Sequence, residues 1–116
     1  MKNFVQMGSN LTLTAPVGGV VSGTAYLTGS LLVVALVTAD AGEEFAAVSE
    51  GVVTLPKENT TAVFAEGDIA YWDDTAKEFD ESAAGRYPSA TVVEAAIATA
   101  ATVKVKLHGR ASMAVV

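Results

Sequence analysis

Short runs of alternating apolar and polar residues, separated by turns, constrain the fold of this chain most strongly. Residues 103–107 read Val-Lys-Val-Lys-Leu, the pattern of a β-strand that buries one face, and Leu11-Thr-Leu-Thr14 repeats it. Turns rich in glycine or proline recur at a spacing of roughly 8–12 residues, which is typical of sandwiches and small barrels. The pattern predicts an all-β fold: a compact β-sandwich or small barrel of short antiparallel strands.

The composition agrees with many short strands in one domain. The 116 residues include 21 alanines and 17 valines but only 8 aromatic residues. Valine and threonine favour extended chain, because their branched side chains fit a pleated surface at little cost in χ1 freedom. A chain of this length forms one core, and without cysteine its stability must come from packing or assembly.

Two segments give less regular signals. The apolar run from Leu31 to Thr38 predicts a central strand covered on both faces. Residues 90–101, ATVVEAAIATAA, combine helix-favouring alanines with strand-favouring Thr-Val-Val. We expect a strand over residues 91–97, followed by a loop.

The segment EGDIAYWDD, residues 66–74, places four carboxylates around the only tryptophan of the chain. Alternation predicts a strand with Ile69 and Tyr71 on one face and Ala70 and Trp72 on the other. A type I turn is expected to begin at Asp73 and to lead into a partner strand at residues 77–79.

Charge and hydropathy exclude several classes of partner. The net charge is −6, and residues 43–81 hold eleven of the thirteen acids with only two bases. Such an acidic region repels phosphates, so we expect no nucleic-acid partner. The longest apolar run has seven residues, where about 20 are needed to span a bilayer, so we expect no membrane partner. With no signal-peptide pattern, we expect a soluble protein made in the cytoplasm.

No motif predicts chemistry. Asp73 and Asp74 are adjacent in a turn, whereas a glycosidase needs two carboxylates that face each other across a cleft. An EF-hand register that starts at Asp73 fails, because Lys77 would occupy a ligand position and Glu78 the glycine position. His108 has no nucleophile motif near it, and no phosphate-binding motif is present. We predict no catalytic residue, cofactor or specific metal site, so the protein is not expected to be an enzyme; a nonspecific divalent ion on the acidic face stays open.

Three segments together resemble a known family. They are MKNFVQMGSNLTLTAP at the start, EGVVTLPK followed by FAEGDIAYWDD in the middle, and ATVVEAAIATAATVKVKLHG near the end. In order and spacing they are similar to the small phage capsid cement, or head decoration, proteins. The resemblance covers roughly residues 1–109, which would form a single β-rich capsid decoration domain, and it leaves residues 110–116 as an apolar C-terminal tail.

The resemblance implies a virion structural protein that binds the outer surface of the phage capsid and cements the head shell. Its expected partners are the major capsid protein and further copies of itself, as a dimer or trimer. It would be made in the host cytoplasm and reside on the capsid exterior. The alternatives are a phage tail or baseplate component, or a β-sandwich module that binds a glycan through an exposed Tyr71 or Trp72.

The expected contacts with the capsid or with other subunits lie at the two ends of the chain. Met113–Val116 offers an apolar strand that a neighbour's sheet edge could accept, although it could equally pack on its own domain. The candidate contact residues are Phe4, Val5, Met7, Met113, Val115 and Val116.

Overall fold

The computed structural model describes residues 10–116, which form two antiparallel β-sheets and no helix. The strands are β1 (Asn10–Thr14), β2 (Ala25–Thr28), β3 (Leu31–Ala35), β4 (Glu44–Val48), β5 (Glu50–Pro56), β6 (Ile69–Asp73), β7 (Glu78–Asp80), β8 (Tyr87–Glu94) and β9 (Thr102–His108). The small sheet has the order β1-β4-β3-β2, and the large sheet has the order β5-β9-β8-β6-β7. The prediction of an all-β fold is confirmed.

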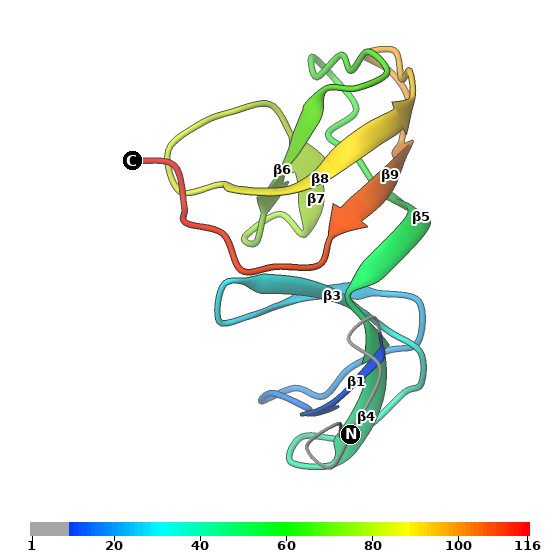
Figure 1. Ribbon diagram of the computed structural model, residues 1–116, viewed down its shortest axis with the longest axis vertical. Helices are drawn as coiled ribbons and strands as arrows, with labels where there is room; N and C mark the ends of the chain where they lie inside the picture. Colours follow the sequence, from blue (N-terminus) through cyan, green and yellow to red (C-terminus); the bar gives the residue numbers. More distant parts are fainter. Residues whose placement is uncertain (1–9) are drawn as a thin grey trace, which may run out of the picture.

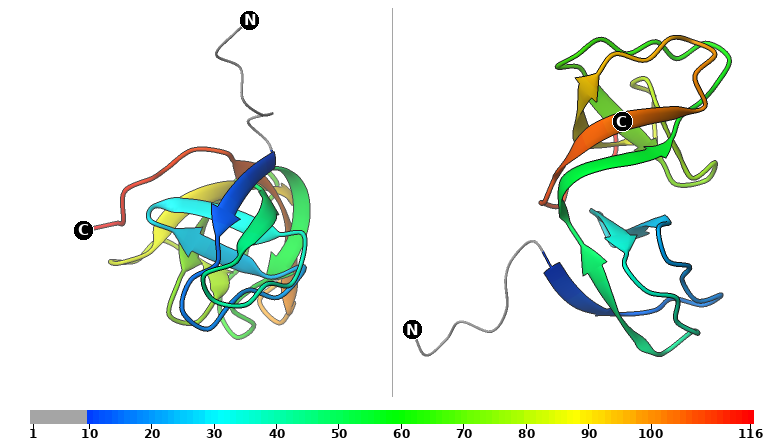
Figure 2. Two further views of the ribbon diagram at one scale, coloured as in Figure 1. Left: turned by 90° about the horizontal axis from the view of Figure 1, so that it is seen from below. Right: turned by 90° about the vertical axis from the view of Figure 1, so that its right-hand side faces the viewer.

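The molecule measures 45 × 34 × 26 Å, and the two sheets follow one another along its long axis (Figure 1). Only the buried Ser49 separates β4 of the small sheet from β5 of the large sheet. The right-hand view of Figure 2 shows β4 and β5 as one curved path that passes from one sheet to the other. The connection between the sheets is therefore almost a continuous strand.

The large sheet curls toward a barrel. Lys57, just after β5, makes a parallel bridge with Phe79 of β7, so the first and last strands of the sheet meet. The backbone N–H of Glu58 donates to the carbonyl of Phe79 at 2.9 Å and extends this contact. Of the two predicted architectures, a β-sandwich and a small barrel, the large sheet therefore takes the barrel form.

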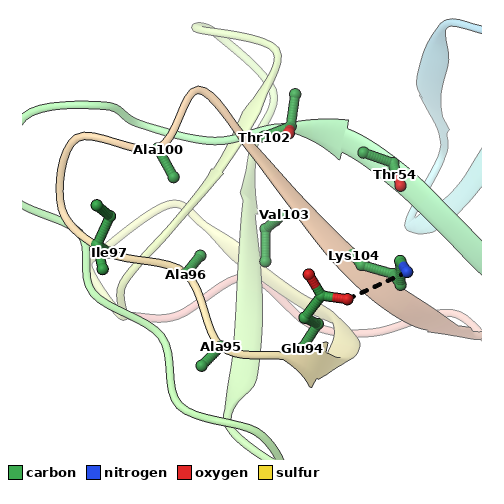
Figure 3. Close-up of a pocket in the computed structure, with 9 residues that line it drawn as sticks. All are labelled: Thr54, Glu94, Ala95, Ala96, Ile97, Ala100, Thr102, Val103 and Lys104. Atoms are coloured by element: carbon green, nitrogen blue, oxygen red, sulfur yellow. Dashed lines mark ion pairs between the residues drawn. The ribbon is translucent and has the colours of Figure 1, made fainter.

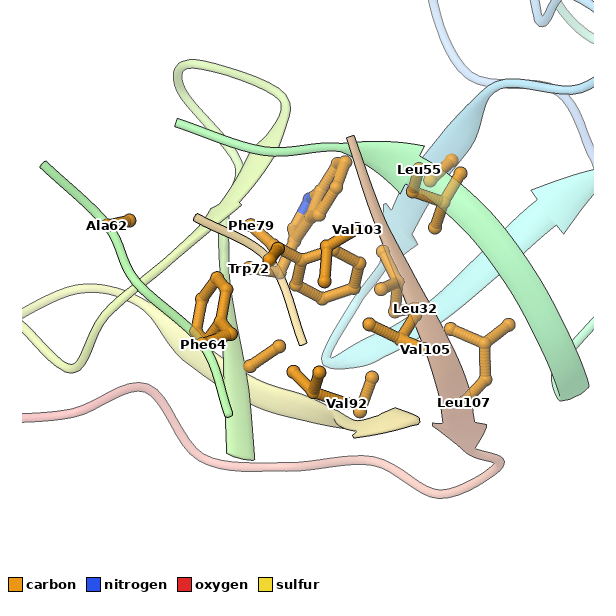
Figure 4. Close-up of a cluster of buried hydrophobic side chains, with 14 of the residues drawn as sticks. Leu32, Leu55, Ala62, Phe64, Trp72, Phe79, Val92, Val103, Val105 and Leu107 are labelled. Carbon is orange, nitrogen blue, oxygen red and sulfur yellow. The ribbon is translucent and has the colours of Figure 1, made fainter. Parts of the chain in front are cut away.

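The interior of the large sheet holds the main core (Figure 4). Val103, Val105 and Leu107 of β9 point inward, while Lys104 and Lys106 are exposed, as their alternation predicts. Further members of this cluster include Leu55, Phe64, Trp72, Phe79 and Val92.

Strand β3 belongs to two cores at once. Leu32 and Val34 pack into the large-sheet cluster, whereas Val33 and Ala35 pack into a second cluster within the small sheet. The prediction of a strand covered on both faces is therefore correct for β3. The prediction is wrong beyond Ala35. The chain leaves β2 at that point, and Ala39 forms a bridge with Val20 instead. Residues 36 and 37 are consequently about half exposed.

The alanine-rich segment also differs from expectation. Strand β8 ends at Glu94, not at residue 97, and its register with β9 shifts between Val92 and Glu94. Beyond this irregularity the chain leaves β9, and Ala96 instead makes an antiparallel bridge with Phe64. The predicted strand over residues 91–97 is therefore divided: its first part pairs with β9, and Ala96 pairs with Phe64.

Candidate functional site

The acidic segment 66–74 comprises a turn at residues 66 and 67, strand β6 and the first residue of the turn after it. Ala70 and Trp72 are buried, and Ile69 and Tyr71 point to the other face, as predicted. Asp73 accepts hydrogen bonds at Oδ1 from the backbone N–H groups of residues 75 and 76, at 3.0 and 3.2 Å. This carboxylate therefore holds the turn in shape.

Asp74 is held by two neighbours. Its Oδ1 accepts a hydrogen bond from Trp72 Nε1 at 3.2 Å and forms an ion pair with Lys77 Nζ at 2.8 Å. Lys77 itself takes a positive φ of 59°, a left-handed conformation that lets the chain enter β7. The turn spans residues 74–77, so β7 begins one residue later than predicted.

Arg86 lies among the remaining acids of the hairpin. Its guanidinium forms ion pairs with Asp80 at 3.1 Å and with Asp73 at 3.7 Å, and it donates to the carbonyl of Glu81 at 2.8 Å. Burial, and then the nearby carboxylate of Asp80, raise the pKa of Glu78. These contacts hold the β6–β7 hairpin together.

The described part of the chain, residues 10–116, contains no group of three or more histidine, cysteine or acidic side chains placed to hold a metal ion. Nor is any helix within this range long and apolar enough to cross a membrane. Trp72 is 1% exposed, so its ring is not available as the aromatic platform that glycan binding would require.

A hollow of about 280 Å³ lies beside the end of β8 and the start of β9 (Figure 3). Its charged residues are Glu94 and Lys104, which pair with each other at 3.1 Å. The rest of its wall consists of alanine, isoleucine and valine side chains and the two threonines, Thr54 and Thr102. The hollow lacks the convergent polar groups that fix the orientation of a small ligand.

His108 is the last residue of β9. Its Nε2 lies 2.9 Å from Thr91 Oγ1 on the adjacent strand. Burial, and then the charge of Arg110, lower the pKa of this imidazole. His108 therefore serves as a polar end to the strand pair β8–β9.

The predicted contact residues have different surroundings. Phe4, Val5 and Met7 lie outside the described residues. Met113 is 85% exposed, and Val116 is fully exposed. The other tail residue, Val115, is half-buried and exchanges two backbone hydrogen bonds, each 2.8 Å long, with residues 85 and 86.

The tail therefore packs on its own chain, one of the two outcomes left open by the sequence. Ser112 N donates to the carbonyl of Ser30, in the β2–β3 turn, at 3.0 Å. Because Val115 is tied to residues 85 and 86 just before β8, the tail joins the small sheet to the large one. Figure 1 shows it running between the two sheets, and we call residues 110–116 the strap.

The structure also exposes apolar side chains that sequence reasoning missed. The Phe64–Ala96 bridge turns these two side chains into the core, so their neighbours Val63 and Ile97 face solvent. Alternation around Phe64 is a signal that could have identified Val63. Other exposed apolar residues are Val17, Val21, Leu36, Val37, Val52 and Ile69.

Comparison with known proteins gives one match. The sequence profile of a family described as phage cement protein matches residues 5–107. No curated protein sequence and no solved structure matches the chain. The matched range contains all nine strands except the last residue of β9, so it spans both sheets. The chain belongs to the phage cement protein family.

Proposed function

We propose that this protein binds the outer surface of an assembled phage capsid, contacts the major capsid protein and cements the head shell without chemistry. The observation that carries the proposal is the family match over residues 5–107. Residues 1–109 would be the decoration domain and residues 110–116 its tail. The protein would be made in the host cytoplasm and join the capsid exterior there.

Binding alone is sufficient for such a role. A protein that binds the assembled shell, and not its separated subunits, stabilises the shell by mass action. Contacts repeated over a lattice add to this effect, because neighbouring copies bind at high effective concentration. The two sheets share the core around β3 and are joined again by the strap.

We further propose that both ends of the chain supply contacts with the capsid or with other subunits. At the C-terminal end, the hydrogen bonds of Val115 hold the strap in place while Met113 and Val116 stay exposed. An apolar side chain presented on a fixed backbone loses less conformational entropy on binding than one on a free tail. At the other end, Phe4, Val5 and Met7 are the proposed contacts.

The test is to add purified protein to undecorated heads and to measure bound protein and the temperature at which the heads break open. We expect saturable binding and a higher disruption temperature. Met113→Asp should weaken binding, because it places a charge in an apolar contact, whereas Val52→Asp, at an exposed site on β5, should not.

Two results would contradict the proposal. Heads that show no saturable binding and no gain in heat resistance would exclude the cement role. Binding to isolated tails but not to heads would favour a tail component. If Val52→Asp lost as much binding as Met113→Asp, the C-terminal contact would be misplaced, although the cement role itself would stand.

A further inference from the structure

Exposed apolar side chains gather on the outer side of the large sheet, beside β6. The antiparallel bridge between Phe64 and Ala96 is a hydrogen-bonded pair, with N···O distances of 3.0 and 2.9 Å in its two directions. The residues next to it, Val63 and Ile97, therefore lie opposite each other as a close pair without hydrogen bonds. Both are more than half exposed, and Ile69 at the start of β6 is about half exposed. Neighbouring apolar side chains left in water in this way are typical of a surface that another molecule covers.

A groove of about 340 Å³ opens within this surface, and we call it the β6 groove. Val63, Ile69 and Tyr71 form its apolar side. The other lining residues are Phe64, Asp68, Glu81 and Ser82. Two carboxylates, one just before β6 and one just after β7, thus border an apolar wall.

The negative charge of the β6 groove is not neutralised within residues 10–116. Neither Asp68 nor Glu81 takes part in any of the ion pairs of this range. The N–H of Ala65 donates to Asp68 Oδ2 at 2.8 Å and so holds this carboxylate in place. Arg86 donates to the backbone carbonyl of Glu81, but its ion pairs are with other carboxylates. The β6 groove therefore suits a partner that presents a cationic side chain beside an apolar one.

The strap carries such a pair of side chains. Arg110 is exposed and forms no ion pair within the described residues, and Met113 is 85% exposed. Three residues separate them, so they are at most about 10 Å apart along the chain. Arginine and methionine are also among the residue types that protein–protein interfaces favour.

The strap does not fill the β6 groove of its own chain. None of residues 110–116 lines the groove. Ser112 is bonded to Ser30 of the small sheet, and Val115 is bonded to residues 85 and 86, so the strap is held elsewhere on its own surface. The segment of matching charge and polarity that remains available is the strap of another copy.

We propose that the β6 groove binds the strap of a second copy of this chain. Arg110 lies against the two carboxylates, and Met113 lies against the apolar side. Because the strap and the groove are different surfaces, each copy offers one of each, and copies joined in this way form a closed ring or an open chain. Contacts between copies on the shell would add to head binding, so this inference deepens the proposed function, but it is tested in solution without heads.

Reversal of single charges tests the ionic part of the contact. Arg110→Glu and Glu81→Lys should each raise the dissociation constant between copies about tenfold in sedimentation equilibrium. A chain with both changes should associate more tightly than either single variant, because the two reversed charges face each other again. The matched controls are Lys106→Glu on β9 and Glu44→Lys on β4, which make the same charge changes at other exposed positions and should leave the constant unchanged.

Mixing two variants tests which surfaces meet. One chain carries Arg110→Glu and Met113→Asp in the strap, and the other carries Val63→Asp and Glu81→Lys in the β6 groove. Each should stay monomeric at a concentration where the native chain associates. The mixture should form a one-to-one dimer, because the intact strap of the second chain fits the intact groove of the first. Both variants remain acidic overall, so their net charges do not favour this pairing.

Four results would overturn the proposal. They are native protein that stays monomeric at its highest soluble concentration, association that the groove variants leave intact, a mixture that stays monomeric, and controls that weaken association as much as the variants do. All altered side chains are exposed, so thermal unfolding midpoints close to that of the native chain should confirm that each variant is folded. Failure of the native protein to bind heads would exclude the cement role but leave this contact between copies intact, so the two proposals fail separately.

Discussion

Trp72 and Phe79 meet edge to face across β6 and β7, with ring centroids 5.1 Å apart and an interplanar angle of 74°. Both rings are buried. Phe79 also bridges Lys57 and accepts the N–H of Glu58, so it lies where the large sheet closes on itself. A single aromatic residue thus joins the hairpin, the core and the closure of the barrel.

We expect Phe79→Ala to be among the most destabilising substitutions in the chain. Loss of a buried phenyl ring and the cavity left behind cost about 3–5 kcal/mol of unfolding free energy. Denaturant unfolding followed by Trp72 fluorescence measures this directly. The control is Ile97→Ala at an exposed site, for which the change should stay within about 0.5 kcal/mol. Similar losses from both variants would show that the aromatic pair does not stabilise the closure.

Lys57 should stabilise the loop before β9. This buried amine donates to the carbonyl of Glu58, and to that of Ala98 at 3.2 Å. Lys57→Met keeps the length of the side chain but removes the donor, and the loss of a hydrogen bond from a charged group costs about 1.5–3 kcal/mol. Hydrogen exchange should become faster at the amides of residues 96–101. Unchanged exchange there would show that the amine does not hold the loop.

Glu58 should make stability depend on pH in the acid range. The Thr60 hydroxyl, followed by backbone N–H groups of Thr61, Thr60 and Ala62, holds the pKa of Glu58 at about 2, below its ordinary value of 4.5. Because the folded pKa is depressed, this contribution is fully present above pH 4.5 and is lost as the pH falls toward 2. A carboxyl titration by NMR should show a midpoint near 2.

Glu58→Gln tests the same contribution thermodynamically. The variant should lose part of the decline in unfolding free energy that the native chain shows between pH 4.5 and 2, because its amide does not titrate. Glu44→Gln, at an exposed position on β4, is the matched control and should leave that decline unchanged. A Glu58 midpoint near 4.5, or equal slopes for all three proteins, would contradict the prediction.

Removal of residues 113–116 should destabilise the chain as well as weaken capsid binding. The deletion removes both backbone hydrogen bonds of Val115, and at about 0.5–1.5 kcal/mol each the loss should be about 1–3 kcal/mol. Val116→Ala changes a fully exposed side chain and should leave stability unchanged within about 0.5 kcal/mol. Thermal unfolding of the three proteins compares them; equal midpoints would show that the strap does not contribute to stability.

The strands with one buried face could be predicted closely. Alternation identified β9 and the inward Ala70 and Trp72 of β6, because a period of two depends only on the local pleat. Asp73 and Asp74 were expected at the turn after this strand, and Asp73 is the last residue of β6 while Asp74 lies in the turn. Their particular partners, such as the Trp72 indole for Asp74, depend on side-chain positions that a spacing rule does not contain.

Errors arose where a strand changed partner. Leu36 and Val37 continue an apolar run, but they lie beyond the last residue of β3, and β8 ends at Glu94 where its pairing with β9 shifts. Hydropathy cannot locate such points, because the residues on both sides are equally suited to extended chain. The end of a strand is determined by the availability of a neighbouring strand.

The sequence by itself determined the all-β class, the inward faces of β6 and β9 and membership of the cement family, because these follow from local periodicity and from the order and spacing of segments along the chain. Tertiary structure alone decided that Phe79 meets Lys57, that Val115 joins residues 85 and 86, and that a groove opens beside β6. These features bring together residues far apart in the chain. Their geometry depends on how two curled sheets pack, which no local pattern encodes.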